Sequence, residues 1–107
     1  MQRGEVFRLR SPRGVRGHEQ AGQRYGVVLQ ADELLSLSTV IIAPTSTRAQ
    51  PASFRPEVEI DGHRTRVLVE QLGAVEPSRL GDSHRLLAFG ELREVARALE
   101  VVLGLGA

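Results

Sequence analysis

Apolar residues fall in short runs over most of the chain, and many of the runs alternate with polar residues as strands do. Residues 4–10, GEVFRLR, have such a pattern and predict a first strand. Residues 25–30, YGVVLQ, predict a second strand. Residues 38–44, STVIIAP, are β-branched and nearly all apolar, so they predict a central strand that is buried on both faces and ends at Pro44.

The second half of the chain continues this pattern. Residues 57–60, EVEI, and 65–75, TRVLVEQLGAV, flank an Asp61-Gly62 pair, which favours a hairpin turn. Residues 85–89, RLLAF, predict a last short strand. Residues 31–37 predict a helical turn, and residues 77–82 predict a turn or a short helix.

One segment has the period of a helix. Residues 90–105 carry apolar residues at i, i+3, i+4 and i+7 spacing, and Gly104 marks the end. The apolar face consists of Leu92, Val95, Ala96, Leu99, Val102 and Leu103. Short strands followed by one helix predict a mainly β fold of the α+β class. We expect a single domain over residues 1–107, built as a small curved antiparallel sheet or SH3-like partial barrel with a C-terminal helix.

Two polar loops interrupt the strands, at residues 11–23 and 45–56. A loop as long as 11–23 in a small domain is usually functional or disordered. If the strands at 25–30 and 38–44 are antiparallel neighbours, the two loops meet at one end of the sheet. That topology would bring Arg24 and Thr45 close together.

Composition excludes several classes of protein. The 107 residues contain no cysteine, which rules out disulfides and thiolate zinc sites. The three histidines lack metal-site spacing, so we expect neither a metal nor another cofactor. No apolar run approaches the length of a membrane span, and the first residues are too polar for a signal peptide, which predicts a cytoplasmic protein without membrane contact.

Charge is distributed unevenly along the chain. Residues 1–30 carry a net charge of +4, whereas residues 31–107 carry −3. All fourteen basic residues are arginines, whose planar guanidinium grips phosphate oxygens in pairs. Arginine in place of lysine also follows from genomic base composition, so only the clustering of charge near the first loop indicates a polyanionic partner.

Four blocks of the sequence resemble the MazF/PemK family of toxin endoribonucleases. They are RGEVF, GHEQAGQR leading into VVLQ, TVIIAPTST, and VLVEQLGAVEPSRLG, in that order. The chain departs from the family pattern at His18, Tyr25 and Gly73, where Ser, Pro and a basic residue are common. The resemblance implies a homodimeric toxin, controlled by a cognate antitoxin, that cleaves single-stranded RNA without a metal and leaves a cyclic phosphate and a 5′-hydroxyl.

The resemblance and the chemistry together suggest site residues. Such a reaction needs a base for the 2′-hydroxyl, a proton for the leaving oxygen and donors for the phosphoryl oxygens. We expect Arg24 to stabilise charge, Thr45 to donate a hydrogen bond, and Glu19 or His18 to act as base. The expected RNA contacts are Arg13, Arg16, His18, Gln20, Ser46, Thr47 and Arg48.

Other interpretations remain open at this stage. Arg24 and Glu19 would also make an ordinary structural ion pair, and Thr45 an ordinary turn residue. A gyrase-binding toxin of the CcdB type has the same fold without nuclease activity. A catalytically inactive RNA-binding domain is the third possibility, and salt-sensitive binding without cleavage would identify it.

Overall fold

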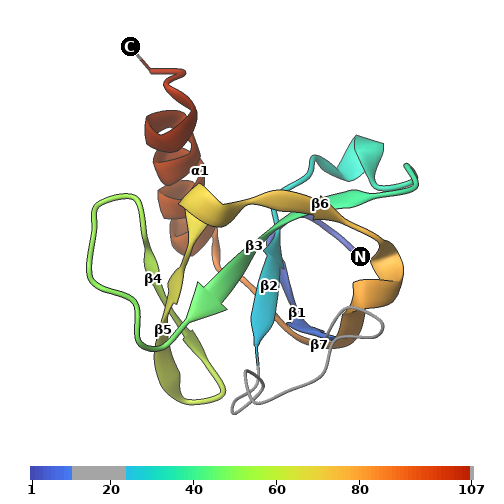
Figure 1. Cartoon of the computed structure of the whole chain (residues 1–107), viewed down its shortest axis with the longest axis horizontal. Coiled ribbons are helices and arrows are strands. Elements are labelled where there is room, and N and C mark those ends of the chain that lie inside the picture. Colours follow the sequence, from blue (N-terminus) through green and yellow to red (C-terminus); the bar gives the residue numbers. More distant parts are fainter. Residues whose placement is uncertain (11–23, 107) are drawn as a thin grey trace.

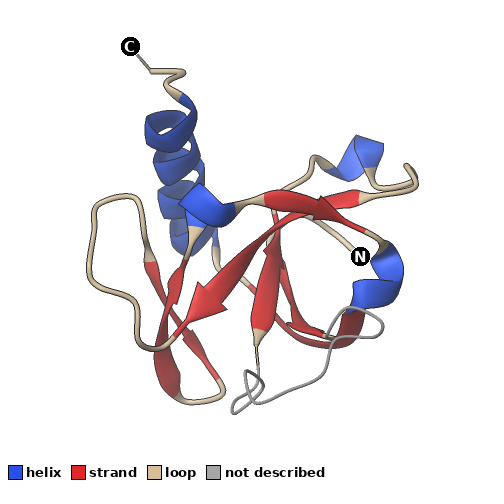
Figure 2. Ribbon diagram, in the orientation of Figure 1, coloured by secondary structure: helices blue, strands red, loops and turns tan. Residues whose placement is uncertain are grey.

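A computed structural model describes residues 1–10 and 24–106. Within these residues the chain forms seven strands in one curled antiparallel sheet, with a single α-helix at the C-terminal end (Figures 1 and 2). The strands are β1 (Glu5–Leu9), β2 (Tyr25–Val28), β3 (Val40–Ser46), β4 (Glu57–Ile60), β5 (His63–Val67), β6 (Gly73–Val75) and β7 (Leu80–Leu86). The predicted fold class, a small curved sheet with a C-terminal helix, is confirmed.

Strand β3 is the centre of the sheet, whose order is β4-β5-β3-β2-β1-β7. One edge of β3 pairs with β2 through Val28↔Ile42, Val27↔Ala43 and Gly26↔Pro44. The other edge pairs first with β6, at residues 40–42, and then with β5, at residues 45–46. This change of partner bends the sheet, so that β4 and β5 turn away from the rest (Figure 1).

Pro44 does not end the central strand, contrary to the sequence-based expectation. β3 continues through it to Ser46. The reason is that Pro44 lies between the segment paired with β6 and the segment paired with β5, where the missing N–H leaves no ladder bond unmade. Its carbonyl still accepts a bond from the backbone N–H of Leu68, at 2.8 Å.

Two hydrophobic clusters lie on opposite faces of the curled sheet. The larger one includes Val6, Val27, Ala43, Ile60, Val67 and Val69, together with Val95 and Ala98 of the helix. The smaller one includes Val28, Val40, Ile42 and Leu80, with Phe7 and Leu9 packed against it. Full burial of a valine stabilises a fold by about 1.5–3 kcal/mol, so these clusters fix which strand residues face which side.

The terminal helix α1 (Phe89–Leu103) begins one residue earlier than predicted. Glu91 accepts a hydrogen bond from the backbone N–H of Ala88 at its start, and Gly104 ends it with φ of 69°. Phe89, the last residue of the strand predicted at residues 85–89, is instead the first residue of the helix and is 78% exposed. Leu103 is also exposed, whereas Ala98, outside the predicted face, is buried.

The hairpin prediction is confirmed, with one change. β4 and β5 meet at Asp61 and Gly62, whose φ angles of 53° and 80° suit an Asp-Gly turn. The segment predicted as one long strand after the turn is broken by the 3₁₀ turn η3 (Val69–Gln71) into β5 and β6. The remaining 3₁₀ turns are η2 (Asp32–Leu34) and η4 (Pro77–Arg79), and β7 follows η4 directly, earlier than the predicted strand at 85–89.

Candidate functional site

The two loop-flanking segments do meet at one end of the sheet, as the sequence predicted. Arg24 immediately precedes β2, and Ser46 is the last residue of β3. Extending the β2–β3 register beyond Gly26↔Pro44 puts Tyr25 opposite Thr45, and Arg24 opposite Ser46. The backbone at Arg24 is held from the other side by β1, because its carbonyl accepts a hydrogen bond from the Leu9 N–H at 2.8 Å.

Arg24 and Thr45 line different hollows, and a shared catalytic role for them stays a prediction. Residues directly opposite each other in a sheet share a face, whereas neighbours along a strand point to opposite faces. Thr45 is 4% exposed, and its hydroxyl donates to the carbonyl of Tyr25 at 3.3 Å. Arg24 lines a different hollow. Ser46 lines the same hollow as Thr45.

We call the hollow at Arg24 the arginine hollow. It has a volume of about 320 Å³. Its lining residues are Leu9, Arg10, Arg24, Ile42, Pro44, Gln71, Gly73, Ala74, Val75 and Arg79. The described lining contains three guanidinium groups and no carboxylate, so the hollow suits an anion.

Hydrogen bonds hold Arg10 and Arg79 in place. Arg10 Nη1 donates to the carbonyl of Ser78 at 2.9 Å, and Arg79 Nε donates to the carbonyl of Arg10 at 2.6 Å. The backbone N–H of Arg10 also donates to the carbonyl of Arg79, at 2.8 Å. A guanidinium has five N–H donors, so each side chain keeps several for a ligand after these bonds. The end of β1 and the turn η4 therefore hold two cations in fixed positions near Arg24.

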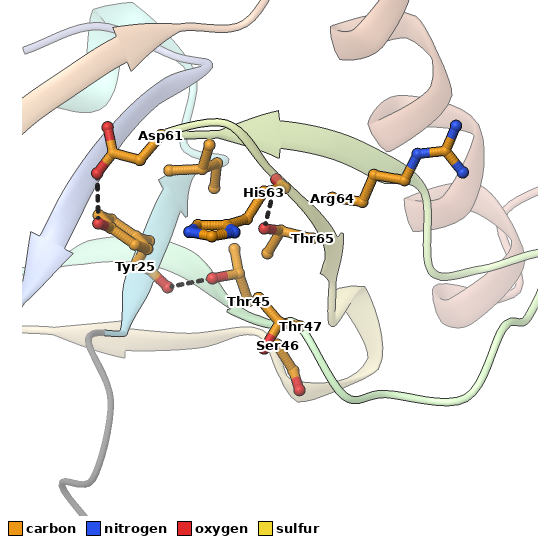
Figure 3. Close-up of a pocket in the computed structure, with 9 residues that line it drawn as sticks. Tyr25, Thr45, Ser46, Thr47, Asp61, His63, Arg64 and Thr65 are labelled. Carbon is orange, nitrogen blue, oxygen red and sulfur yellow. Dashed lines mark hydrogen bonds between the residues drawn. The ribbon is translucent and has the colours of Figure 1, made fainter.

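We call the second hollow the hydroxyl hollow (Figure 3). It has a volume of about 490 Å³ and lies between the end of β3 and the β4–β5 hairpin. Its lining residues are Tyr25, Thr45, Ser46, Thr47, Ile60, Asp61, His63, Arg64 and Thr65. Hydroxyl and aromatic groups dominate the lining, in contrast to the arginine hollow.

Tyr25, Asp61 and His84 form a polar cluster beside this hollow. The Tyr25 hydroxyl donates to Asp61 Oδ2 at 2.8 Å, and His84 Nδ1 lies 3.2 Å from the same oxygen. The rings of Tyr25 and His84 meet edge to face, with centroids 4.8 Å apart. The bond from Tyr25, with the His84 contact, lowers the pKa of Asp61 below its usual value. Burial and the Asp61 carboxylate raise the pKa of Tyr25.

The remaining predicted contact residues on β3 and after it lie at the surface. Thr47 and Arg48 are exposed, and Ser46 is half-buried. The backbone N–H of Arg48 donates to Ser46 Oγ at 3.1 Å, which leaves the hydroxyl proton of Ser46 for another acceptor. Arg48 lines neither hollow.

Several expectations cannot be placed on the structure. Arg13, Arg16, His18, Glu19 and Gln20 lie outside the described residues. Among residues 1–10 and 24–106, no group of three or more His, Cys, Asp or Glu side chains is arranged to hold a metal ion. None of the helices in this described part has the length and hydropathy needed to cross a bilayer.

Sequence reasoning missed Arg10, Arg79, Asp61 and His84. The charge bias of residues 1–30 pointed to Arg10, but no local pattern singled out Arg79. Asp61 was noticed only as a turn residue. No sequence signal marks His84, since only the folded chain brings β7 beside Tyr25 and the hairpin turn.

Comparison with known proteins gives a consistent result. The sequence profile of the family described as "PemK-like, MazF-like toxin of type II toxin-antitoxin system" matches residues 2–103. The candidate toxin Rv3098A of Mycobacterium tuberculosis is 41% identical, with 96% of this chain and 97% of that protein covered. The endoribonuclease MazF of Staphylococcus saprophyticus is 32% identical, with 98% and 92% covered. A solved mycobacterial endoribonuclease in complex with its cognate antitoxin has the same fold, with a TM-score of 0.79, 15% identity, and 98% and 96% coverage.

Proposed function

Because the chain belongs to the PemK-like, MazF-like family of type II toxin–antitoxin toxins, we propose that it is a metal-independent, sequence-specific endoribonuclease that cleaves single-stranded RNA. The observation that carries this proposal is the arginine hollow, where Arg10, Arg24 and Arg79 gather without a carboxylate in the described lining. Permanent positive charge at fixed positions stabilises a phosphorane-like transition state more than the ground state, since charge builds up on the phosphoryl oxygens.

The reaction needs no cofactor. The 2′-oxygen attacks the adjacent phosphorus, the bond from phosphorus to the 5′-oxygen breaks, and a 2′,3′-cyclic phosphate and a 5′-hydroxyl are formed. A base takes the proton of the 2′-hydroxyl, and the leaving oxygen gains one. Glu19 and His18 are both candidates for the base. Arg24 serves as the electrostatic group, since a guanidinium stays protonated at neutral pH.

Ser46 is a second candidate for the hydroxyl partner of Arg24. It lines the hydroxyl hollow with Thr45, but it follows Thr45 at the end of β3, and its hydroxyl keeps its proton to donate. Thr45, which the sequence suggested for this role, is nearly buried and donates to the Tyr25 carbonyl. We therefore assign Thr45 the task of positioning the start of β2, and so the Arg24 backbone. Arg13, Arg16, His18, Gln20, Thr47 and Arg48 are proposed to contact the RNA strand.

Partners follow from the same proposal. A cognate antitoxin would inhibit the toxin by covering the arginine hollow. A homodimer is supported by exposed apolar residues at both ends of the terminal helix and just beyond it, namely Phe89, Val101, Leu103 and Leu105, which a second copy would cover. The toxin would act in the cytoplasm, where its RNA is.

The decisive experiment incubates the purified protein with diverse single-stranded RNA in EDTA. We expect fragments that end in cyclic phosphate and 5′-hydroxyl groups, at an unchanged rate after chelation. Arg24→Ala should lower the rate by at least about 100-fold, as loss of a transition-state donor does. Ser46→Ala should lower the rate more than Thr45→Val, which keeps the shape of the side chain.

Circular dichroism of each variant provides the control for folding. RNA that stays intact across all sequences, or undiminished cleavage by a folded Arg24→Ala variant, would refute the proposed function. RNA that is bound but never cut would identify a non-catalytic RNA-binding domain instead. A rate loss that is larger in Thr45→Val than in Ser46→Ala would move the hydroxyl role back to Thr45.

A further inference from the structure

The hydroxyl hollow directly adjoins the residues assigned to cleavage. Tyr25 lines the hydroxyl hollow and directly follows Arg24, which lines the arginine hollow. Thr45 also lines the hydroxyl hollow and directly follows Pro44, which lines the arginine hollow. The two hollows thus lie on either side of the ends of β2 and β3. The hydroxyl hollow, at about 490 Å³, has the size of known small-ligand sites, which span roughly 300–1,000 Å³.

The chemistry of this hollow differs from that of its neighbour. Its lining offers the ring of Tyr25, the imidazole of His63 and hydroxyl groups such as that of Thr47 (Figure 3). Arg64 lines it as well, but its Nε lies 3.2 Å from Glu57 in an ion pair. A flat aromatic wall with neutral donors and acceptors suits an unstacked nucleobase better than a phosphate.

The aromatic wall is held in place by the Asp61 cluster. Tyr25 donates its hydroxyl hydrogen to Asp61 and meets the ring of His84 edge to face, so the ring has neighbours on two sides. A ring fixed before binding loses little conformational entropy when a base stacks on it.

Asp61 is also equipped to select the base. An ionised carboxylate accepts about four hydrogen bonds, and the contact of Tyr25 with Oδ2 and those of His84 with both oxygens use at most three of these sites. The lowered pKa keeps the group ionised, hence a pure acceptor, at neutral pH. A carboxylate pairs with an exocyclic amino group of a base and repels a carbonyl oxygen at the same place.

We propose that the hydroxyl hollow holds one unstacked nucleobase of the RNA, and that Asp61 selects adenine, cytosine or guanine, which carry amino groups, over uracil. The inference rests on the proposed function, since it assigns part of the cleavage specificity. A strand with one phosphate at the arginine hollow would pass the ends of β2 and β3 and present a neighbouring base to Tyr25. The position selected would therefore lie at a fixed offset from the cut.

The test is the variant Asp61→Asn, compared by sequencing all 5′ ends produced from a random RNA pool. Asparagine adopts positive φ readily, so the turn at φ of 53° tolerates it. It replaces one acceptor oxygen by an amide donor, which pairs with the carbonyl oxygen of uracil. We expect wild type to cut at sites with an amino-bearing base at one fixed offset, and Asp61→Asn to shift that position toward uracil by about 10-fold.

Asp82→Asn is the matched control, because Asp82 is an exposed acid on β7 that lines neither hollow. It should leave the site preference unchanged, which separates recognition from loss of negative charge. Tyr25→Phe keeps the ring but removes the bond to Asp61, and should weaken the preference without reversing it.

The outcomes separate this inference from the proposed function. If wild type cuts RNA and Asp61→Asn cuts the same sites at the same frequencies, the base pocket is refuted and the nuclease stands. If wild type cuts nothing, the nuclease is refuted, and the affinities of four short oligoribonucleotides that differ at one base decide the pocket. Equal affinities would then overturn it, whereas a preference against uracil that Asp61→Asn abolishes would support it.

Discussion

The arginine hollow makes a quantitative prediction for the salt dependence of RNA binding. Neutralising a phosphate on a single strand releases counterions, and each contact adds about −0.7 to the slope of log K against log salt. If Arg10, Arg24 and Arg79 each contact phosphate, the hollow contributes a slope of about −2.1. Between about 50 and 200 mM salt, that part of the affinity falls about 18-fold.

The perturbation is Arg79→Gln, which removes one charge. The contribution of the hollow to the slope should drop to about −1.4, so this part of the affinity falls only about 7-fold over the same salt range. The assay is fluorescence anisotropy with a labelled single-stranded RNA that carries 2′-O-methyl groups, which block the attacking oxygen. Contacts from the first loop add to the total slope in every variant, so the difference between variants is the measured quantity.

Arg79→Lys is the control for structure. It loses the bond from Arg79 Nε to the Arg10 carbonyl but keeps the charge, so the slope should stay at the wild-type value. Arg93→Gln removes a charge from α1, where the guanidinium lies over the Phe89 ring, and should also leave the slope unchanged. An Arg79→Gln variant with the wild-type slope would show that no phosphate occupies this side of the hollow.

Two further predictions concern stability. Asp61 has a lowered pKa in the folded state, so its contribution is fully present above about pH 4 and is lost as pH falls through the folded pKa. Tyr25→Phe removes the main cause of the shift, and its Tm should therefore fall less steeply between about pH 5 and pH 2 than that of wild type; equal slopes would contradict the cause assigned. Val95→Ala removes two buried methyl groups between α1 and the sheet and should lower the free energy of unfolding by about 2 kcal/mol in urea titration. A loss below about 0.5 kcal/mol would mean that the helix is not docked at this residue.

Local sequence patterns predicted most of the helices and strands, because a few neighbouring residues determine where such elements form. The Asp61-Gly62 turn and the period of α1 are determined by a few neighbouring residues, and both are found in the structure. The limits of β3 were mispredicted because they depend on two partners. Pro44 would end a strand with ladder bonds on both sides, but the change from β6 to β5 removes that requirement.

The exposure of Phe89 has a similar explanation. β7 ends at Leu86, Leu87 enters the core, and Phe89 lies beyond that contact as the exposed first residue of the helix. The buried residues of α1 begin farther along, at Val95 and Ala98. The predicted helix face is thus largely confirmed, since Val95 is buried and Leu99 and Val102 pack against the core, and it differs in that Ala98 joins the core and Leu103 is exposed.

The choice between Thr45 and Ser46 shows where sequence reasoning reaches its limit at a site. The sequence predicted that the segments containing Arg24 and Thr45 lie side by side, and β2 and β3 are indeed antiparallel neighbours. Which side chain shares a face with Arg24 depends on register, and a shift of one residue reverses the face. Gly26↔Pro44 is the last pair of that register, beyond which Thr45 and Ser46 both line the hydroxyl hollow while Arg24 lines the arginine hollow. The same alternation that separates Thr45 from Arg24 also creates two hollows of different chemistry at one strand end, which is what a strand of alternating phosphates and bases requires.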